Sequence, residues 1–587
     1  MCGIFALLNN IGASWESISR EFMKGQRRGP EFSKLDTNYT GMTLGFHRLA
    51  INGLNEASNQ PLVINDVALI CNGEIYNYHQ LYKDMGVEPE TGSDCEVIIH
   101  LYLKYGIEQT LLMLDGVYAF VLYDNREQPD GIKRSFVARD PLGVRPLYYL
   151  KPLSNNTELM SYGYASELKC LEHFYNADIG KYTIGQFKPG SYSAFTLSGG
   201  NNDIWVSEKE NTPYFLPIFS HSWQINEQIE TSLYRQMYSN ISAYLNAAVV
   251  KRCLTTERPV ACLLSGGLDS SLITALVNNF YVSNNVPSKL ETYSIGLSGS
   301  EDLRHARIVA DYLGTKHTEI LITEQQMFDA IPEVIKAIES YDTTTVRASI
   351  GNYLLGKYIA AHSDAKVIFN GDGSDELLGG YLYMNKCPDD IEFDKESRRL
   401  LRDIHLFDVL RSDKSISSHG LEPRTPFLDR SFVNFMLAVP PYFRNHKNKR
   451  GMEWNSQTHD YSGIEKYLLR YSFSEHFFLD YRRRQILPNE ILWRKKEAFS
   501  DGVTAHGRSL FTIIQEQICH RLNADNIYHI HVPSIELEKA YYKRIFDEAY
   551  PNCSHVLPYF WMPKYTNATD PSARTLDFYS INALSSV

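Results

Sequence analysis

The sequence predicts two domains of different fold class: an α+β domain with stacked antiparallel sheets and helices, followed by an α/β domain with a parallel sheet. Its 587 residues exceed what one hydrophobic core usually supports. Short runs of β-forming residues separated by turns fill about the first two hundred positions. Strands and helices alternate in the remainder, which is the pattern of a parallel sheet with helices on both faces.

The predicted first domain contains short strands and one clear helix. Apolar side chains recur at helical spacing over about residues 94–105. The chain becomes polar and rich in Gly, Asn and Glu at 198–213, which predicts a linker. The first domain is therefore expected over residues 1–197 and the linker over 198–224. The predicted strands lie at 43–46, 67–71, 119–123 and 135–138.

The predicted second domain covers residues 225–564 and begins with a helix, because Ile241, Leu245 and Val249 recur at helical spacing. A buried strand at 259–264 runs directly into a Ser/Gly-rich loop and a second helix. Further strands are predicted at 292–297 and 366–369.

Ligands bind parallel sheets at the carboxyl ends of the strands, where Ser265 and Gly371 would lie. Residues 565–587 show no clear period and are predicted to form a loosely ordered C-terminal tail.

Composition excludes several classes of protein. The net charge of −11 argues against a nucleic-acid binder, which needs a basic surface. No apolar run is long enough to span a bilayer, and no signal peptide is recognisable, so the chain is expected in the cytoplasm. Nine cysteines at irregular spacings, without a C-x-x-C pair, predict neither a disulfide framework nor a zinc site.

The N-terminal cysteine is distinguished by its position alone. Removal of Met1 would leave Cys2 with a thiol nucleophile and a free α-amine. The amine can serve as the base for that thiol. This arrangement predicts hydrolysis through a covalent intermediate.

The loop at residues 265–271 is predicted to bind a pyrophosphate. Two Gly, three Ser and one Asp occupy six of its seven positions, directly after a strand and before a helix. Backbone N–H groups and hydroxyls can therefore converge on phosphate oxygens at the positive end of the helix. No Lys-Ser or Lys-Thr pair follows the glycines, so this is not a Walker loop, and Asp269 would instead hold Mg²⁺. The alternative is a turn that needs glycine only for backbone freedom.

Ordered strings of residues over positions 1 to about 503 give the chain a close resemblance to the glutamine-dependent asparagine synthetases. The loop itself is similar to the pyrophosphate loop of N-type ATP pyrophosphatases, and the first domain resembles an Ntn-type glutamine amidotransferase. The strings are Met1-Cys2-Gly3-Ile4, His47-Arg48-Leu49, Gln60-Pro61-Leu62, Asn72-Gly73-Glu74-Ile75-Tyr76-Asn77, Ser93-Asp94-Cys95-Glu96, Ala138-Arg139-Asp140-Pro141, Pro146-Leu147-Tyr148, the 265–271 loop, Tyr341-Asp342, Arg347-Ala348-Ser349, Gly371-Asp372-Gly373-Ser374-Asp375-Glu376, Thr425-Pro426-Phe427-Leu428-Asp429 and Phe499-Ser500-Asp501-Gly502.

In the first domain the resemblance implies a glutaminase. Cys2 would attack the side-chain amide of glutamine. Arg48 would pair with the α-carboxylate of glutamine and Asp94 with its α-ammonium, which fits the charges. Asn72 and the backbone N–H of Gly73 would form the oxyanion hole. The remaining pocket residues implied are Leu49, Ala50, Ile51, Asn52 and Glu74.

In the second domain the resemblance implies that aspartate attacks the α-phosphorus of ATP. Ammonia would then displace AMP from β-aspartyl-AMP to give asparagine. Asp269 and Asp375 would handle Mg²⁺ and pyrophosphate, and Lys466 would stabilise charge on the α-phosphate, although a helix-face lysine fits the spacing of Lys466 equally well. The implied ATP-binding residues are Leu264, Ser265, Gly266, Gly267, Asp269, Ser270, Ile295, Asn370 and Gly371.

The chain departs from the family pattern at three places. Asp372 stands where the family has Glu, which shortens a carboxylate expected to assist catalysis by about 1.5 Å. Asn370 replaces a Ser, and an insertion is expected around residues 442–462, just before Lys466. We also hypothesise that ammonia passes from Cys2 to Asp372 through a dry internal passage, since ammonium in bulk water is a poor nucleophile.

Two other functions are alternatives, and a third is excluded. A β-lactam synthetase shares the adenylation step, but these relatives typically lack the nucleophilic cysteine, so Cys2, Arg48 and Asp94 argue against it. A non-catalytic homologue is disfavoured by Cys2 and Asp269, although Asp372 leaves it some weight. Glutaminases with other acceptors do not adenylate, so the loop at residues 265–271 excludes this third function. Glutamine, aspartate and ATP are the expected partners, and the family's frequent dimers imply a homodimer.

Overall fold

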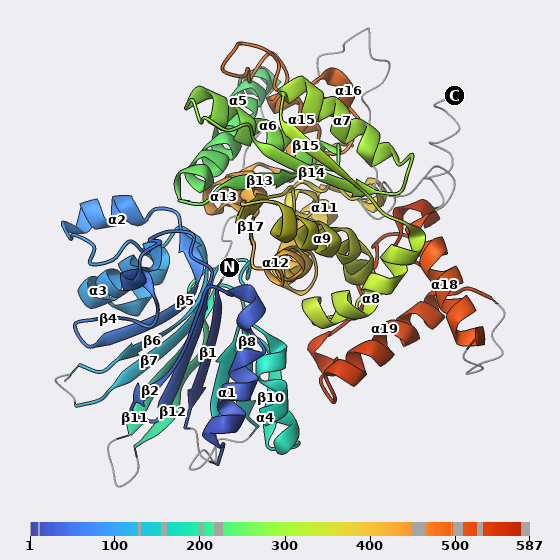
Figure 1. The fold of residues 1–587 in the computed structure, drawn as a ribbon. Helices are drawn as coiled ribbons and strands as arrows, with labels where there is room; N and C mark the ends of the chain where they lie inside the picture. Colours follow the sequence, from blue (N-terminus) through green and yellow to red (C-terminus); the bar gives the residue numbers. More distant parts are fainter. Residues whose placement is uncertain are drawn as a thin grey trace.

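The computed structural model describes residues 2–9, 12–126, 131–153, 161–198, 203–215, 227–447, 464–494, 496, 509–524 and 532–576. The first domain lies at the lower left of Figure 1 and the second at its upper right, with the N-terminus between them. Most of the insertion expected at 442–462, and the string at 499–502, fall outside the described residues.

The first domain is a pair of stacked antiparallel sheets, as predicted. Their strand orders are β10-β8-β9-β1-β3-β2 and β12-β11-β7-β6-β5-β4. Its elements are β1 (Gly3–Leu8), α1 (Trp15–Met23), β2 (Phe32–Tyr39), β3 (Met42–Arg48), β4 (Leu62–Ile64), β5 (Val67–Ile75), α2 (Tyr78–Met85), α3 (Val97–Met113), β6 (Gly116–Asp124), β7 (Arg134–Arg139), β8 (Tyr148–Pro152), β9 (Tyr162–Ala165), α4 (Glu172–Ala177), β10 (Tyr182–Gln186), β11 (Ser191–Ser198) and β12 (Ile204–Pro213).

Alternating side chains explain the layers of this domain. Ile4 and Ala6 of β1 pack between the two sheets, against Ile70 of β5. Phe5, between them in sequence, points to the opposite face, where it packs with α1. Because successive residues of a strand face opposite sides, strands buried on both faces are apolar throughout. The helices α2 and α3 cover the outer face of the second sheet.

The second domain is built on a parallel sheet, also as predicted, with strand order β15-β14-β13-β16-β17. All four strand pairs are parallel. Its elements are α5 (Glu227–Leu254), β13 (Val260–Leu263), α6 (Leu268–Ser283), β14 (Glu291–Gly296), α7 (Glu301–Leu313), β15 (Lys316–Leu321), α8 (Glu324–Ile338), α9 (Thr343–His362), β16 (Val367–Phe369), α10 (Ser374–Leu378), α11 (Asp390–Asp403), α12 (Asp408–Ser417), β17 (Glu422–Arg424), α13 (Arg430–Ala438), α14 (Pro441–Arg444), α15 (Tyr467–Ser472), α16 (Asn489–Leu492), α18 (Leu510–Ala524) and α19 (Ile535–Ala549).

Helices cover both faces of this sheet. Val260 and Cys262 of β13 pack on one side with α5 and α6. Ala261 and Leu263 face the other side, where they pack with residues of α9 and α12. The strand is therefore buried on both faces, which is why 259–264 is an almost unbroken apolar run.

Part of the predicted linker is a strand. Residues 204–213 form β12, which pairs with β11 at the edge of the second sheet of the first domain. Trp205 is buried and donates a hydrogen bond from Nε1 to Thr40 O at 3.0 Å. The exposed face of an edge strand contacts water, so its Glu and Lys residues resemble a linker in sequence.

The predicted C-terminal tail is ordered over its first part. Asp570 forms a buried ion pair with Arg347 at 2.8 Å, and Leu576 is buried beside Trp561. Single anchoring residues hold this segment, so it shows no sequence period. Residues 577–587 lie outside the described part of the chain.

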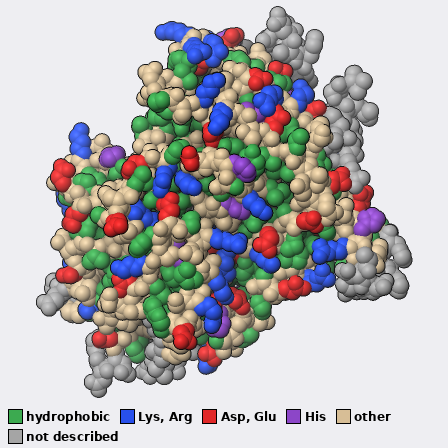
Figure 2. Space-filling view, viewed as in Figure 1, with side chains coloured by type: hydrophobic (Ala, Val, Ile, Leu, Met, Phe, Trp, Pro, Cys, Tyr) green, Lys and Arg blue, Asp and Glu red, His purple; other side chains and the backbone are tan. Residues whose placement is uncertain are grey.

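The surface mixes charges of both signs. On the face drawn in Figure 2, Lys and Arg side chains are interspersed with Asp and Glu over both domains. Among the residues that the structure describes, no helix combines the length and apolar composition that crossing a bilayer requires.

Candidate functional site

Cys2 lies where the two domains meet, immediately before β1 (Figure 1). Its Sγ approaches Leu49 O at 3.6 Å, and its backbone carbonyl accepts a hydrogen bond from Arg28 Nε at 3.0 Å. Burial raises the pKa of the Cys2 thiol to about 11. The thiol is thus protonated at neutral pH, and attack on a substrate requires a base.

Arg48 ends β3 and points into the loop that follows it. Its guanidinium donates to Asn55 O at 2.9 Å, to Asn59 Oδ1 at 2.7 Å and to Gly53 O. Burial lowers the pKa of Arg48. In this structure the residue expected to clamp a carboxylate therefore also holds the shape of its own loop.

Three polar side chains gather beside this loop. Asn52 Nδ2 donates to Glu74 Oε2 at 2.7 Å and lies 3.5 Å from Asp94 Oδ1. Asp94 Oδ2 accepts a hydrogen bond from Ile75 N at 2.7 Å. Burial raises the pKa of Asp94 to about 6 and that of Glu74 well above its usual range. The cluster is a buried acidic patch suited to an ammonium group.

The expected oxyanion-hole residues lie on β5, next to the strand that follows Cys2. Ser166 Oγ accepts hydrogen bonds from Ile4 N at 3.1 Å and from Asn72 Nδ2 at 3.4 Å. Asn72 Oδ1 is buried and has no protein partner. A Cβ at Gly73 would lie 2.5 Å from Val117 O, so only glycine fits this position.

A cavity of about 250 Å³ lies in the second domain at the carboxyl ends of β13, β14 and β16. Gly266 does not line it: this residue forms the turn before α6, with φ of +74° and no room for a Cβ beside Ala306. The other residues expected at the nucleotide site do line it, namely Leu264, Ser265, Gly267, Asp269, Ser270, Ile295, Asn370, Gly371, Asp372, Asp375 and Lys466.

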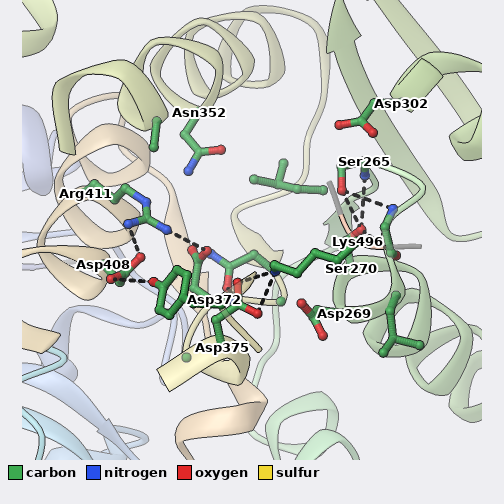
Figure 3. A pocket seen from close by; sticks show the side chains of 18 of the residues that line it. Ser265, Asp269, Ser270, Asp302, Asn352, Asp372, Asp375, Asp408, Arg411 and Lys496 are labelled. Atoms are coloured by element: carbon green, nitrogen blue, oxygen red, sulfur yellow. Dashed lines mark hydrogen bonds and ion pairs between the residues drawn. The ribbon is translucent and has the colours of Figure 1, made fainter. Parts of the chain in front are cut away.

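The Ser/Gly-rich loop presents its donors to this cavity (Figure 3). Ser265 Oγ lies 2.9 Å from Ser270 Oγ and accepts a hydrogen bond from Gly267 N at 3.4 Å. No side chain caps the N-terminus of α6, whereas Ser300 caps α7 and Thr323 caps α8. The uncapped N–H groups and the helix dipole suit an anion.

A cluster of charged side chains lies in the same cavity as this loop. Lys466 Nζ lies 2.5 Å from Asp269 Oδ2 and 2.5 Å from Asp375 Oδ1. Lys496 Nζ is 2.6 Å from Asp375 Oδ2. Although burial opposes it, the two ammonium groups hold the pKa of Asp375 well below its usual range. Asp269 also accepts a hydrogen bond from Ser374 Oγ at 2.8 Å.

The opposite end of the cavity carries a second group of charges (Figure 3). Arg411 of α12 lies 3.9 Å from Asp372 Oδ1 and forms a closer pair with Asp408. Asp372 Oδ2 is buried without a partner, and burial raises the pKa of Asp372. Tyr381 OH lies 3.3 Å from Asp408 Oδ2 and donates more closely to Glu376. This end can hold a ligand that carries both charges.

Lys496, Arg411 and Asp408 were not predicted as site residues. Arg411 and Asp408 lie on a helix whose sequence carries no local nucleotide signal, and Lys496 belongs to a short basic run. Only tertiary packing brings them to the cavity. Glu376 was signalled by the Gly371-to-Glu376 string, but no role was assigned to it.

Comparisons with known proteins cover nearly the whole chain. The sequence model of the glutamine amidotransferase domain matches residues 1–191, and that of asparagine synthase matches residues 241–392 and 385–569. The chain is 39% identical over 595 residues to the asparagine synthetase [glutamine-hydrolyzing] of Homo sapiens, covering 99% of each chain. It is 40% identical over 592 residues to that of Gallus gallus, again covering 99% of each.

Proposed function

This chain belongs to the family of glutamine-hydrolysing asparagine synthetases, and we propose that it divides the family's reaction between the Cys2 site and the cavity of its second domain. The chain converts aspartate to asparagine with glutamine as nitrogen donor and ATP as energy source. One observation supports this division most strongly. Asp269, Asp375 and Lys466 converge beside the Ser265 loop in the second domain, whereas Cys2 belongs to the first.

At the first site, the Cys2 sulfur attacks the amide carbon of glutamine, and ammonia leaves after taking up a proton. The raised pKa of the thiol supports a nearby base, for which the α-amine of Cys2 is suited once Met1 is removed. Asn72 Nδ2 and Gly73 N–H stabilise the oxyanion. Water then releases glutamate from the thioester.

Glutamine is held at this site through its α-substituents. Asp94 and Glu74 face the α-ammonium, a role supported by their shared contact with Asn52. Arg48 reaches the α-carboxylate by exchanging one of its present loop acceptors, such as Asn55 O. The pocket is thus built on the loop at residues 49–53.

At the second site, a β-carboxylate oxygen of aspartate attacks the α-phosphorus of ATP, and pyrophosphate leaves. The ammonia delivered from the first site then attacks β-aspartyl-AMP at its carbonyl carbon, and AMP leaves. The Ser265 loop and Lys466 stabilise the phosphate charge, and Lys496 adds a second cation. Asp372, with its unpartnered Oδ2, accepts a proton from the attacking ammonia.

We also assign Mg²⁺ to Asp269 and Asp375. Their carboxylates converge on one ammonium group, at 2.5 Å from each, so their oxygens lie close enough together to share a cation. Carboxylate oxygens are the ligands that Mg²⁺ prefers, and the ion would neutralise pyrophosphate charge. A homodimer, proposed from family resemblance, would be tested by light scattering.

Replacement of the nucleophile tests this division of labour. Cys2→Ala is expected to abolish asparagine synthesis from glutamine while synthesis from high ammonia is retained, because the two sites use separate residues. Both activities would be measured on the purified full chain by following asparagine. Loss of both activities in a variant with an unchanged unfolding temperature would contradict two separable sites.

A further inference from the structure

Two adjacent residues of the second domain, Glu257 and Arg258, form hydrogen bonds with the glutamine loop, which comprises residues 49–53 of the first domain. Both residues lie between α5 and β13. Glu257 N donates to Ile51 O at 3.0 Å, and Glu257 Oε1 accepts from Gly53 N at 2.6 Å. Arg258 Nε donates to Ala50 O at 2.7 Å. Three backbone positions of the loop at 49–53 are thus hydrogen-bonded by one short segment of the other domain.

A third side chain closes this arrangement. Glu31 of the first domain accepts a hydrogen bond from Ala50 N at 2.7 Å, and its other oxygen pairs with Arg258 Nη2 at 2.9 Å. Both the N–H and the C=O of Ala50 therefore depend on the Arg258–Glu31 pair.

The backbone that accepts and donates these hydrogen bonds also orients the side chains proposed to bind glutamine. Gly53 donates its N–H to Glu257 and accepts the Arg48 guanidinium at its carbonyl. Gly53 also has φ of +59°, and a Cβ there would lie 2.3 Å from Ser58 Oγ, so this turn of the loop requires glycine. Asn52 lies between Ile51 and Gly53, and its Nδ2 donates a hydrogen bond to Glu74 Oε2 at 2.7 Å.

We propose that Glu257 and Arg258 are positioning residues for glutamine, so that the second domain completes the glutamine site of the first. Neither residue touches the reacting atoms. Their hydrogen bonds fix the backbone from which Asn52 projects and to which the Arg48 guanidinium donates, and pre-organisation of this kind lowers the cost of binding. The inference rests on the proposed function, because it assumes that the loop binds glutamine.

The location of this pair also joins the two sites. Arg258 is followed by Pro259 and then by β13, whose carboxyl end leads into the Ser265 loop. One continuous segment therefore contacts the loop at residues 49–53 at its start and lines the cavity of the second domain at its end.

Steady-state kinetics of the full chain test the proposal. Glu257→Ala and Arg258→Ala are expected to raise the KM for glutamine by about three- to tenfold, the effect of losing one or two partly exposed hydrogen bonds, with little change in glutaminase kcat. Glu257→Gln keeps an oxygen acceptor for Gly53 N–H and is expected to retain a nearly wild-type KM. The unfolding temperature and the KM for ATP in ammonia-dependent synthesis are measured alongside.

Arg307→Ala is the matched control, because Arg307 forms a similarly exposed ion pair with Glu319 at 2.8 Å on the same domain. Its KM for glutamine is expected to stay at the wild-type value. The proposal is overturned if Glu257→Ala and Arg258→Ala leave this KM within twofold of wild type, or if Arg307→Ala raises it equally. Failure of the proposed function is distinct, since the wild-type chain would then make no asparagine from glutamine.

Discussion

Lys466 Nζ lies 2.5 Å from Asp269 Oδ2, although 197 positions separate the two residues in sequence. The contact needs an unusual backbone: Lys466 has φ of +57°, and a Cβ at Gly380 would lie 2.0 Å from Lys466 Cε. Glycine at 380 thus makes room for the lysine. An ion pair whose lysine is buried thereby joins the Ser265 loop to the segment before α15, and removal of Lys466 would leave Asp269 without this cation.

Replacement of this lysine separates the two activities. Lys466→Met is expected to lower the kcat for ammonia-dependent asparagine synthesis by about 10²- to 10³-fold, because it removes a cation that faces the transferring phosphate. Glutaminase activity, measured as glutamate release, is expected to stay near wild type. Lys336→Met, on the exposed face of α8, serves as the control. Equal losses in both variants would refute the assignment.

Glutamine binding is expected to weaken in mild acid. Asp94 must be ionised to pair with the α-ammonium, and burial raises its pKa to about 6. The kcat/KM for glutamine should therefore fall by about tenfold per unit as the pH drops below 6. The folded-state pKa exceeds the ordinary 3.8, so this group favours the fold at low pH and that contribution is lost as the pH rises through about 6.

The matched variant is Asp94→Asn, which should raise the KM for glutamine and change the acid limb of the pH profile, because Glu74 is then the remaining carboxyl group of this cluster. A profile with the same limb in the variant would show that another group titrates there. Asp178→Asn, at an exposed position, should behave as wild type.

The shortened carboxylate at position 372 is expected to be functional. Asp372→Asn should lower the kcat of ammonia-dependent synthesis by about 10²-fold or more, as loss of a general base does. Asp372→Glu, which restores the residue of the family pattern, should keep at least wild-type activity, because the cavity borders this side chain. Rates for Asp372→Asn equal to wild type would remove this residue from the mechanism.

The packed start of the C-terminal segment is expected to stabilise the second domain. Asp570 makes two hydrogen bonds to the buried Arg347, each 2.8 Å long. Asp570→Ala should destabilise the protein by about 2 kcal/mol, as loss of buried hydrogen bonds to a charged group does, while Arg347 keeps its ion pair with Glu538. Asp547→Ala, which removes an exposed pair with Lys543, should cost less than about 0.5 kcal/mol. Denaturant unfolding would measure both, and equal effects would contradict a packed segment.

Local patterns predicted the sheets and many of the residues that line the cavity of the second domain. The apolar run of β13 and the loop after it are contiguous in sequence, so their geometry follows from strand, turn and helix preferences. The strand β12 was missed because an edge strand can carry charged side chains on its exposed face.

Long-range contacts lie beyond this kind of prediction. Lys496 and Arg411 line the cavity from segments that carry no recognisable nucleotide motif. The hydrogen bond between Glu257 and Gly53 N–H likewise links two domains that are distant in sequence. The contacts of Arg48 could not be predicted either. Its neighbours in sequence identify the residue, but its hydrogen bonds to the following loop depend on the folded backbone.

One chain is expected to couple glutamine hydrolysis to aspartate adenylation. The most direct measurement incubates the purified full chain with glutamine, aspartate and Mg-ATP and follows asparagine, glutamate, AMP and pyrophosphate together. Coupled sites should form asparagine, AMP and pyrophosphate in equal amounts, accompanied by glutamate. Release of glutamate without AMP or asparagine would show that the chain is a glutaminase alone.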